Sequence, residues 1–331
     1  MTVPRKSSMR AVVLNAPGPP ESLVVQDVPL PEPEPGWVRI RVRAFGLNRS
    51  ELYTRQGLSG DAVTFPRVPG IEAVGTVDVD PSGTLRHGQQ VAAIMGGMGR
   101  KFDGGYAEYV CVPASVVIPF SSDLDWAVLG AVPEMLQTAH GSLTTGVDLR
   151  PGQTLLIRGG TSSVGLTAAL LAKKMDAVVL ATTRDPAKAD LLRAQGVDHV
   201  LIEDGAVAVQ VRRLVPEGVH GAIELVGTGT LPDTLRATRT QGTVCFTGML
   251  ANEWTIPQFH PMDVIPQGVR LTAYAGEAHN LSPQVLQQFL DDVASHRIHV
   301  PLARRYRLDE IVAAHREMEA NSLGGKGVVV T

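Results

Sequence analysis

The 331-residue chain is poor in cysteine and aromatic residues and has no block of like charge, and each shortage excludes a class of protein. Two cysteines, Cys111 and Cys245, can form neither a disulfide framework nor a site of three or four thiolates. A net charge of −3 and 5% aromatic residues argue against nucleic acid or an anionic membrane as a partner. The longest apolar runs, such as 168–172, are far shorter than the roughly 20 residues of a membrane span. The opening residues lack the apolar stretch of a signal peptide, so we expect a cytoplasmic protein.

The first third of the chain has the pattern of a β-rich domain. Residues 9–120 contain short alternating segments separated by Gly and Pro turns. Residues 37–43 alternate apolar and charged side chains, which is typical of a strand with one buried face. We expect the apolar side chains of this strand, Val38, Ile40 and Val42, to be buried. Its three arginines, Arg39, Arg41 and Arg43, are expected to point outward into solvent. Residues 1–8 are expected to form a loose extension.

From about residue 123, helical stretches alternate with short apolar strands. The expected strands are 154–158, 177–182, 199–202, 221–226, 243–247 and 269–274, with helices at 162–175, 186–195, 206–215 and 230–239. This alternation predicts an α/β fold with a doubly wound parallel sheet. Two later helices, 283–296 and 308–320, and a strand, 327–330, are too short to form a domain. We therefore expect a dinucleotide-binding domain at 125–271 and a β-rich domain at 1–124 that is completed by 272–331.

The clearest local motif is a glycine-rich turn between a strand and a helix at residues 155–165. Gly160 and Gly165 match the first and third glycines of G-x-G-x-x-G, and Ser162 holds the second position. Such a turn points backbone N–H groups and a helix N-terminus at an anion. A serine-hydrolase elbow fits less well because G-x-S-x-G fails at Val164, and the remaining alternative is an ordinary strand–helix turn. We expect a dinucleotide diphosphate to bind here, with Ser163 and Val164 among its contacts.

The end of the following strand indicates which dinucleotide binds. NAD sites favour an acidic residue there, to bind the ribose 2′-hydroxyl. This chain has Thr183 at that position, Arg184 beside it and Lys188 one helical turn later. Two cations suit a 2′-phosphate, so we expect NADPH. The alternative is a solvated helix start, in which Asp185 only caps the helix that begins at Pro186.

Five sequence blocks give the chain a family resemblance from Met9 to Thr331. They are residues 46–53, 69–75, 103–109, 159–165 and 242–248. The chain resembles the medium-chain dehydrogenase/reductase superfamily, and within it the zinc-free quinone oxidoreductase branch. The resemblance implies a GroES-like catalytic domain beside a Rossmann domain, with a cleft between them. It also implies NADPH as cofactor and a homodimer in which cofactor domains pair through an edge strand, for which 269–274 is the candidate.

The residues that bind zinc in other members of the superfamily are missing. Zinc alcohol dehydrogenases have a cysteine in the segment matching 46–50, which here has none, and a histidine where this chain has Ile71. Cys111 and Cys245 lie in apolar strands and are expected to be buried and inert. We therefore expect no metal site. Without a Lewis acid an alcohol is a poor substrate, whereas quinones and α,β-unsaturated carbonyls accept a hydride readily.

The resemblance also assigns site residues. It implies that Asn48 and Tyr53 face the nicotinamide and substrate, with the Tyr53 hydroxyl donating to the carbonyl oxygen; the alternative is a half-buried helix tyrosine. It further implies that Thr138 lies near the nicotinamide carboxamide and Asn321 near the cofactor phosphates. Four more candidates lie at the ends of parallel strands, where open sheets bind ligands: Val226, Phe246, Gly248 and Met249. Ser59 replaces a second tyrosine that the branch often has, and Arg55 and Gln56 are expected to be solvated.

Three functions remain open at this point. The first is an NADPH-dependent quinone reductase acting on a small electrophilic acceptor. The second is an NADPH-dependent reductase of alkenes in enals, enones or enoyl thioesters. The third, from another class, is a non-catalytic NADPH-binding protein.

Overall fold

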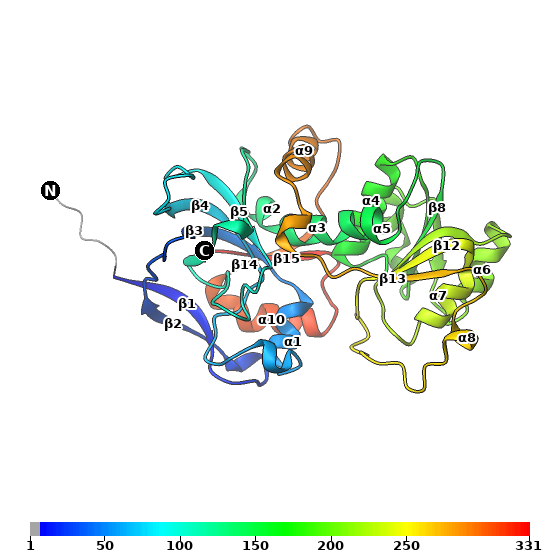
Figure 1. Ribbon diagram of the computed structural model, residues 1–331, viewed down its shortest axis with the longest axis horizontal. Helices are drawn as coiled ribbons and strands as arrows, with labels where there is room; N and C mark the ends of the chain where they lie inside the picture. Colours follow the sequence, from blue (N-terminus) through cyan, green and yellow to red (C-terminus); the bar gives the residue numbers. More distant parts are fainter. Residues whose placement is uncertain (1–6) are drawn as a thin grey trace. The chain divides into compact units, whose positions relative to one another are not determined.

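The computed structural model describes residues 7–331, which form two compact units (Figure 1). Unit 1 consists of the chain up to Glu134 together with Glu277–Thr331, and unit 2 is Met135–Gly276. Of the loose extension expected at 1–8, residues 1–6 lie outside the described part, and Ser8 already begins strand β1. Within 7–331 no helix is long and apolar enough to cross a membrane.

Unit 2 contains the expected doubly wound parallel sheet. Its strand order is β10-β9-β8-β11-β12-β13, and all neighbouring pairs are parallel. The strands are β8 (Thr154–Arg158), β9 (Val178–Thr183), β10 (His199–Ile202), β11 (Val219–Glu224), β12 (Thr238–Phe246) and β13 (Arg270–Ala273). Strand β12 begins before the predicted residue 243 because Thr238 already pairs with Val219, ahead of a bulge in the register. The prediction of an α/β Rossmann sheet is confirmed.

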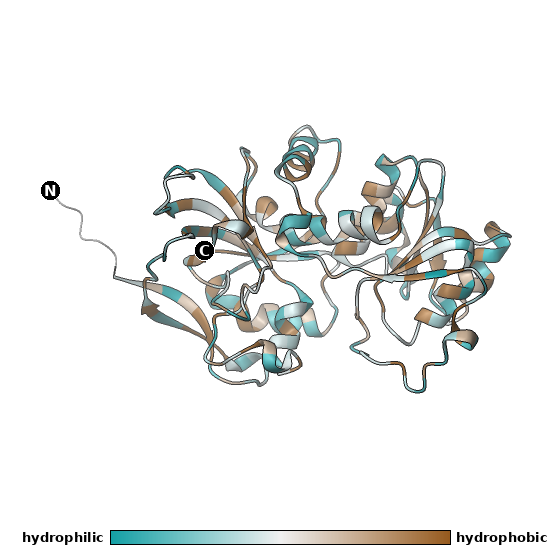
Figure 2. Cartoon of the chain, viewed as in Figure 1, coloured by the Kyte–Doolittle hydropathy of each residue, from teal (hydrophilic) through white to brown (hydrophobic). Residues whose placement is uncertain are grey.

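Helices cover both faces of this sheet because alternate strand residues point to opposite sides. Leu155 and Ile157 of β8 belong to one core and Leu156 to the other. The helices of unit 2 are α3 (Pro133–Gly141, which starts in unit 1), α4 (Ser163–Lys174), α5 (Ala189–Ala194), α6 (Val207–Leu214), α7 (Leu231–Ala237) and α8 (Pro261–Val264). Residues of α4 and α5 pack in the first core and residues of α6 and α7 in the second. Figure 2 shows hydrophobic and hydrophilic residues alternating along these amphipathic helices.

Unit 1 is built on a seven-stranded sheet that joins the two ends of the chain. Its order is β14-β15-β3-β4-β5-β7, with β6 also paired to β3, and β1 and β2 form a separate pair. The strands are β1 (Ser8–Leu14), β2 (Leu23–Pro29), β3 (Trp37–Gly46), β4 (Glu72–Val79), β5 (Gln90–Ile94), β6 (Tyr109–Pro113), β7 (Val117–Pro119), β14 (Leu302–Arg307) and β15 (Lys326–Val330). Its helices are α1 (Arg49–Arg55), α2 (Trp126–Ala131), α9 (Pro283–Ala294) and α10 (Ile311–Glu319). Strand β15 pairs antiparallel with β3.

The boundaries between the two units lie at 134–135 and 276–277, whereas the sequence predicts domain boundaries at 124–125 and 271–272. Helix α2 accounts for the first difference because it packs on β3 and β15 of unit 1. A Cβ on Gly130 of α2 would lie 2.8 Å from the Cβ of Ala44, so the helix and strand are in close contact. At the second boundary, β13 continues to Ala273 because it remains paired with β12.

One prediction about strand β3 is wrong. Val38, Ile40 and Val42 are buried as expected, but Arg39 is only 8% exposed. Its Nε donates to Asp78 Oδ2 at 2.6 Å and its Nη1 donates to the Pro31 carbonyl at 2.9 Å. Asp78 on the neighbouring strand β4 pairs with this guanidinium, and the connecting segment at Pro31 and Glu32 also contacts it.

Candidate functional site

The turn after β8 depends on glycine at three positions. Gly159 has φ +86°, and its N–H donates to Thr182 Oγ1 at 3.0 Å. A Cβ on Gly160 would lie 2.8 Å from the Cβ of Ala181, and a Cβ on Gly165 would lie 2.6 Å from the Gly159 carbonyl oxygen. At Gly160 the turn therefore packs directly against β9, and at Gly165 the first turn of α4 packs against the glycine turn, so a side chain at either position would force these segments apart.

Helix α4 presents hydrogen-bond donors at its start. Ser162 is its N-cap: its Oγ accepts from the Gly165 N–H at 3.1 Å and donates to the Gly159 carbonyl at 2.9 Å. The N–H groups of Ser163 and Val164 have no acceptor within the helix, because first-turn donors lack a preceding turn. No acidic residue lies in this turn. Donors of this kind fit an anionic diphosphate.

The end of β9 offers cations and no side-chain carboxylate of its own. Thr183 is buried, and its hydroxyl donates to the Asp185 carbonyl at 3.0 Å and accepts from the Asp185 N–H at 3.1 Å. The Asp185 carboxylate caps the 3₁₀ turn Pro186–Lys188 by accepting from the Ala187 N–H at 3.0 Å. Arg184 is exposed and Lys188 half-buried, and neither forms an ion pair with any residue in 7–331. Both cations are thus available to a phosphate.

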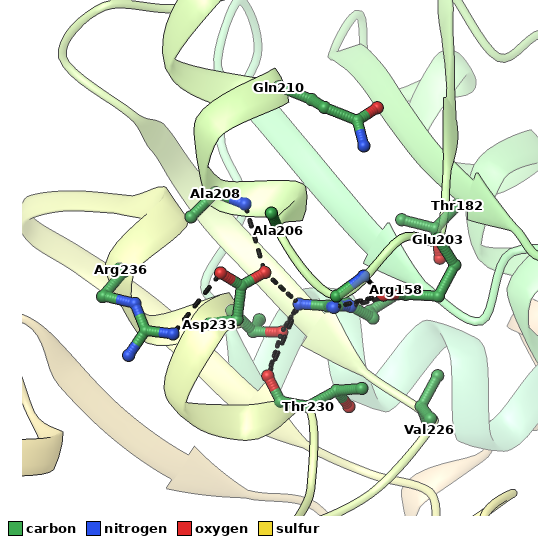
Figure 3. A network of polar contacts seen from close by, with 12 residues as sticks. Arg158, Thr182, Glu203, Ala206, Ala208, Gln210, Val226, Thr230, Asp233 and Arg236 are labelled. Atoms are coloured by element: carbon green, nitrogen blue, oxygen red, sulfur yellow. Dashed lines mark hydrogen bonds and ion pairs between the residues drawn. The ribbon is translucent and has the colours of Figure 1, made fainter.

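A buried ionic network at the ends of the strands was not anticipated from the sequence (Figure 3). Arg158, the last residue of β8, is fully buried. Its Nη1 donates to Asp233 Oδ2 of α7 at 2.7 Å, and its Nε and Nη2 donate to Glu203 after β10 at 2.7 and 2.5 Å. The sequence feature that could have indicated this network is an arginine at the end of an otherwise apolar strand.

Glu224 extends this network at the end of β11. Its carboxylate accepts from the N–H groups of Val226 and Gly227 at 2.7 and 3.1 Å and from the hydroxyls of Thr230 and Thr234 at 3.0 and 2.5 Å. Burial raises the pKa of Glu224, against these hydrogen bonds and the nearby Arg158 charge. Glu224 therefore fixes the backbone of the loop that carries Val226.

The remaining candidates of unit 2 gather at the ends of β11 and β12. Phe246 pairs with Glu224, and the Gly248 N–H donates to the Glu224 carbonyl at 3.0 Å. Four of these residues are half-buried, namely Val226, Phe246, Gly248 and Met249. Thr138 of α3 is linked to the same region, since its carbonyl accepts from Ser142 Oγ, which contacts Thr247 Oγ1 at 2.9 Å.

In unit 1, Asn48 is held in a buried charge cluster. It is the N-cap of α1, and its Nδ2 donates to Glu72 Oε1 at 3.0 Å. Its Oδ1 accepts from the Lys326 ammonium of β15. Lys326 also lies 2.8 Å from Glu72 and 3.3 Å from Glu134, and it is 1% exposed. Both ends of the Asn48 amide are thus oriented by charged neighbours.

Glu51 joins this cluster to the loop before β4. Its Oε2 accepts from the Asn48 N–H at 2.8 Å, completing a capping box, and its Oε1 accepts from the Ile71 N–H at 2.9 Å. Burial raises the pKa of Glu51 to about 7, although these hydrogen bonds and Lys326 act in the opposite direction. Ile71 contributes only its backbone here.

This donor set does not suit a zinc ion. The Ile71 side chain has no ligand atom, and the Glu72 carboxylate is already paired with the ammonium of Lys326. Within 7–331, no group of three or more His, Cys, Asp or Glu residues is placed to hold a metal ion. Burial raises the pKa of Cys111 to about 12 and also raises that of Cys245, so both remain thiols at neutral pH.

Tyr53 and Asn321 lie on and beside α1. Tyr53 is 9% exposed, and burial raises its pKa, which keeps the phenol protonated. Asn321 accepts through Oδ1 from Arg49, the first residue of α1. The structure thus brings Asn48, Tyr53 and Asn321 to one helix of unit 1.

The expectation that Arg55 is solvated is wrong. It is 1% exposed, pairs with Glu319 of α10, and donates to the Gly18 carbonyl. Gln56 is exposed as expected, with its Nε2 donating to Glu319 at 2.8 Å. Arg55 therefore holds α1 against α10.

Comparison with known proteins identifies the family. A family model described as "Alcohol dehydrogenase GroES-like domain" matches residues 34–122, and one described as "Zinc-binding dehydrogenase" matches 163–294. A quinone oxidoreductase from Lama guanicoe is 24% identical over 97% of each chain. A prostaglandin reductase-3 from Bos taurus is 28% identical over 78% of this chain and 68% of its own length.

Two further comparisons extend this likeness. A synaptic vesicle membrane protein VAT-1 homolog-like protein from Mus musculus is 30% identical over 64% of this chain and 49% of its own length, so the match spans about half of that relative. A mycobacterial protein solved in complex with NADPH is 27% identical, with a TM-score of 0.86 over 98% of this chain and 100% of that one. The chain belongs to the medium-chain dehydrogenase/reductase superfamily, has its NAD(P)-binding fold, and is similar to its quinone oxidoreductases.

Proposed function

We propose that the chain is a zinc-independent, NADPH-dependent oxidoreductase that transfers a hydride to a quinone. The observation that supports this proposal is the buried cluster of Asn48, Glu72 and Lys326, in which the Glu72 carboxylate is already paired with an ammonium. With no Lewis acid to polarise an alcohol, an acceptor that takes a hydride easily is favoured. The relative from Lama guanicoe is itself a quinone oxidoreductase.

The choice of NADPH rests on the end of β9. Arg184 and Lys188 are free of ion pairs within 7–331, and Thr183 stands where NAD sites carry an acidic residue. When bound, NADPH supplies the hydride. The first turn of α4 would hold the diphosphate, and the two cations would hold the 2′-phosphate.

Tyr53 is the proposed proton donor. Hydride addition gives the quinone two electrons and leaves an oxyanion, which takes one proton to become the hydroquinone. The raised pKa of Tyr53 keeps a proton on its hydroxyl at neutral pH, and solvent would restore it afterwards. Asn48 would line the site with its side-chain amide. The hydrogen bonds of this amide to Glu72 and Lys326 determine its orientation.

Reduction of an activated alkene is the second candidate. Bovine prostaglandin reductase-3 is a relative, and Ser59 stands where the quinone branch often has a second tyrosine. An enone accepts the hydride at its β-carbon and leaves an enolate, which needs the same proton donor. We also propose a homodimer formed through β13, one of the two edge strands of its sheet.

A screen of acceptors tests these functions. NADPH oxidation would be measured with quinones, enones and enoyl thioesters, with NADH as a control and with a chelator in a parallel series. We expect quinones to turn over fastest, NADPH to be preferred, and the chelator to have no effect. Turnover of enones alone would establish the alkene reductase. NADPH binding without oxidation by any acceptor would favour a non-catalytic protein.

A further inference from the structure

Arg100 belongs to a rigid loop that follows β5. The Met95 N–H donates to the Ile71 carbonyl at 2.7 Å, and the Gly96 N–H donates to Glu277 at 3.2 Å. A Cβ on Gly99, which has φ +72°, would lie 2.7 Å from the Gly70 nitrogen. The loop is thus packed against the segment before β4, and the backbone of Arg100 has a fixed position.

The guanidinium of Arg100 lacks a counter-charge. Its Nη2 donates to Ser50 Oγ at 2.5 Å, and it forms no ion pair with any residue in 7–331. Its Nε is buried without a hydrogen-bond partner, one of two such side-chain atoms in the described chain. The other is Arg67 Nε, but the guanidinium of Arg67 pairs with Asp103 at 3.0 Å. Protein covers Nε itself, whereas Nη1 has no partner within 7–331 and is not among the covered atoms, so Nη1 is the charged donor that is left for a ligand.

Ser50 connects Arg100 to the candidate catalytic helix. Ser50 and Tyr53 are three residues apart on α1 and therefore lie on the same side of it. Ser50 Oγ accepts from Arg100, and its own hydroxyl proton has no acceptor among residues 7–331. Two unsatisfied donors, one of them charged, thus lie beside the helix face that carries the proposed proton donor.

We propose that Arg100 and Ser50 bind a carboxylate carried by the acceptor, so that the enzyme selects anionic acceptors over neutral ones. This inference rests on the proposed function and adds the substrate class. A guanidinium offers paired N–H donors that match the two oxygens of a carboxylate, and the Ser50 hydroxyl supplies a third donor. Arg100 is then a specificity-determining residue and takes no part in proton or hydride transfer.

A matched pair of acceptors tests the assignment. The full-length protein and its Arg100→Gln variant would be compared with a neutral naphthoquinone and with the same quinone bearing a carboxylate. We expect Arg100→Gln to raise KM for the carboxylate quinone by about 10- to 100-fold, because the variant loses a charge-assisted hydrogen bond to the carboxylate. KM for the neutral quinone should change by less than about threefold, and Arg100→Lys should restore part of the preference. Lys101→Gln, at an exposed neighbouring cation, is the control.

A binding measurement separates this proposal from the proposed function. Calorimetric titration of the cofactor-free protein with naphthoate should give heat in the wild type and none in Arg100→Gln. If no quinone is reduced but naphthoate binding needs Arg100, the proposed reaction is wrong and the carboxylate site stands. If Arg100→Gln raises KM equally for both quinones, the carboxylate assignment is overturned. The same holds if naphthoate binds the variant as tightly as it binds the wild type.

Discussion

Tyr53 carries the chemical part of the proposed function, and its hydroxyl can be removed with little change in shape. Tyr53→Phe should lower kcat by about 10²-fold or more, because the oxyanion then takes its proton from water. The dissociation constant of NADPH should stay within about twofold. Steady-state kinetics together with a fluorescence titration of NADPH would check both. An unchanged kcat would remove Tyr53 from the mechanism.

Arg184 and Lys188 determine the expected cofactor preference. Replacing both by Ala should weaken NADPH binding by about 10²- to 10⁴-fold, since each of the two charge-assisted contacts contributes roughly 1.5–3 kcal/mol. NADH, which lacks the 2′-phosphate, should bind almost unchanged. Dissociation constants for both dinucleotides would be compared with those of Arg193→Ala, an exposed arginine of α5 that pairs with Asp190. Equal weakening of NADPH and NADH would refute the phosphate role.

Helices α1 and α10 meet at a buried histidine that makes unit 1 sensitive to acid. His315 is fully buried, its Nε2 lies 3.1 Å from Tyr106 Oη, and Arg55 Nε donates to its Nδ1 at 3.4 Å. Burial, and secondarily the charge of Arg55, lowers the pKa of His315 to about 3 from an ordinary value of 6.5. Below pH 6.5 the unfolded chain therefore binds a proton that the native protein does not.

The sign of the effect follows from this difference in proton binding. His315 contributes stability that is complete above pH 6.5 and is lost as pH falls toward 3, at up to about 1.4 kcal/mol per pH unit. His315→Gln should be less stable than the wild type at pH 7 but should lose less stability between pH 6.5 and 4.5. Denaturant unfolding at several pH values would measure the two slopes, with His279→Gln, an exposed histidine, as control. Parallel slopes in wild type and His315→Gln would contradict the assignment.

The sequence predicted unit 2 far better than the polar contacts of the site. Strands such as 154–158 are continuous apolar runs between helical patterns, and they occur where expected. Strand β14 was missed because half of its residues are arginine, and only Tyr306 in it is buried. Arg39 and Arg55 were wrongly predicted to be solvated, because a sequence does not show which distant carboxylate will meet a given arginine. Asn48 and Tyr53 became candidates only through family resemblance.

Lys326 links the last strand to helix α1 and strand β4. Lys326→Met should destabilise the protein by about 3–5 kcal/mol, because it removes the counter-charge of the fully buried Glu72 carboxylate. Combining it with Glu72→Gln should cost less than the sum of the two single changes, since the second change removes the uncompensated charge. Urea unfolding of the four proteins gives the coupling energy directly. Strict additivity would mean that the two side chains do not interact.

The position of strand β15 in the sequence also affects the order in which the two units can fold during synthesis. Unit 2 is contiguous in sequence, so all six strands of its sheet are synthesised before β14 and β15. Strand β3 pairs with β15, so this partner of β3 is made only after the whole of unit 2. In a cell, the dinucleotide-binding unit can therefore fold during translation, while the unit that carries Tyr53 waits with an unpaired strand edge that chaperones must protect.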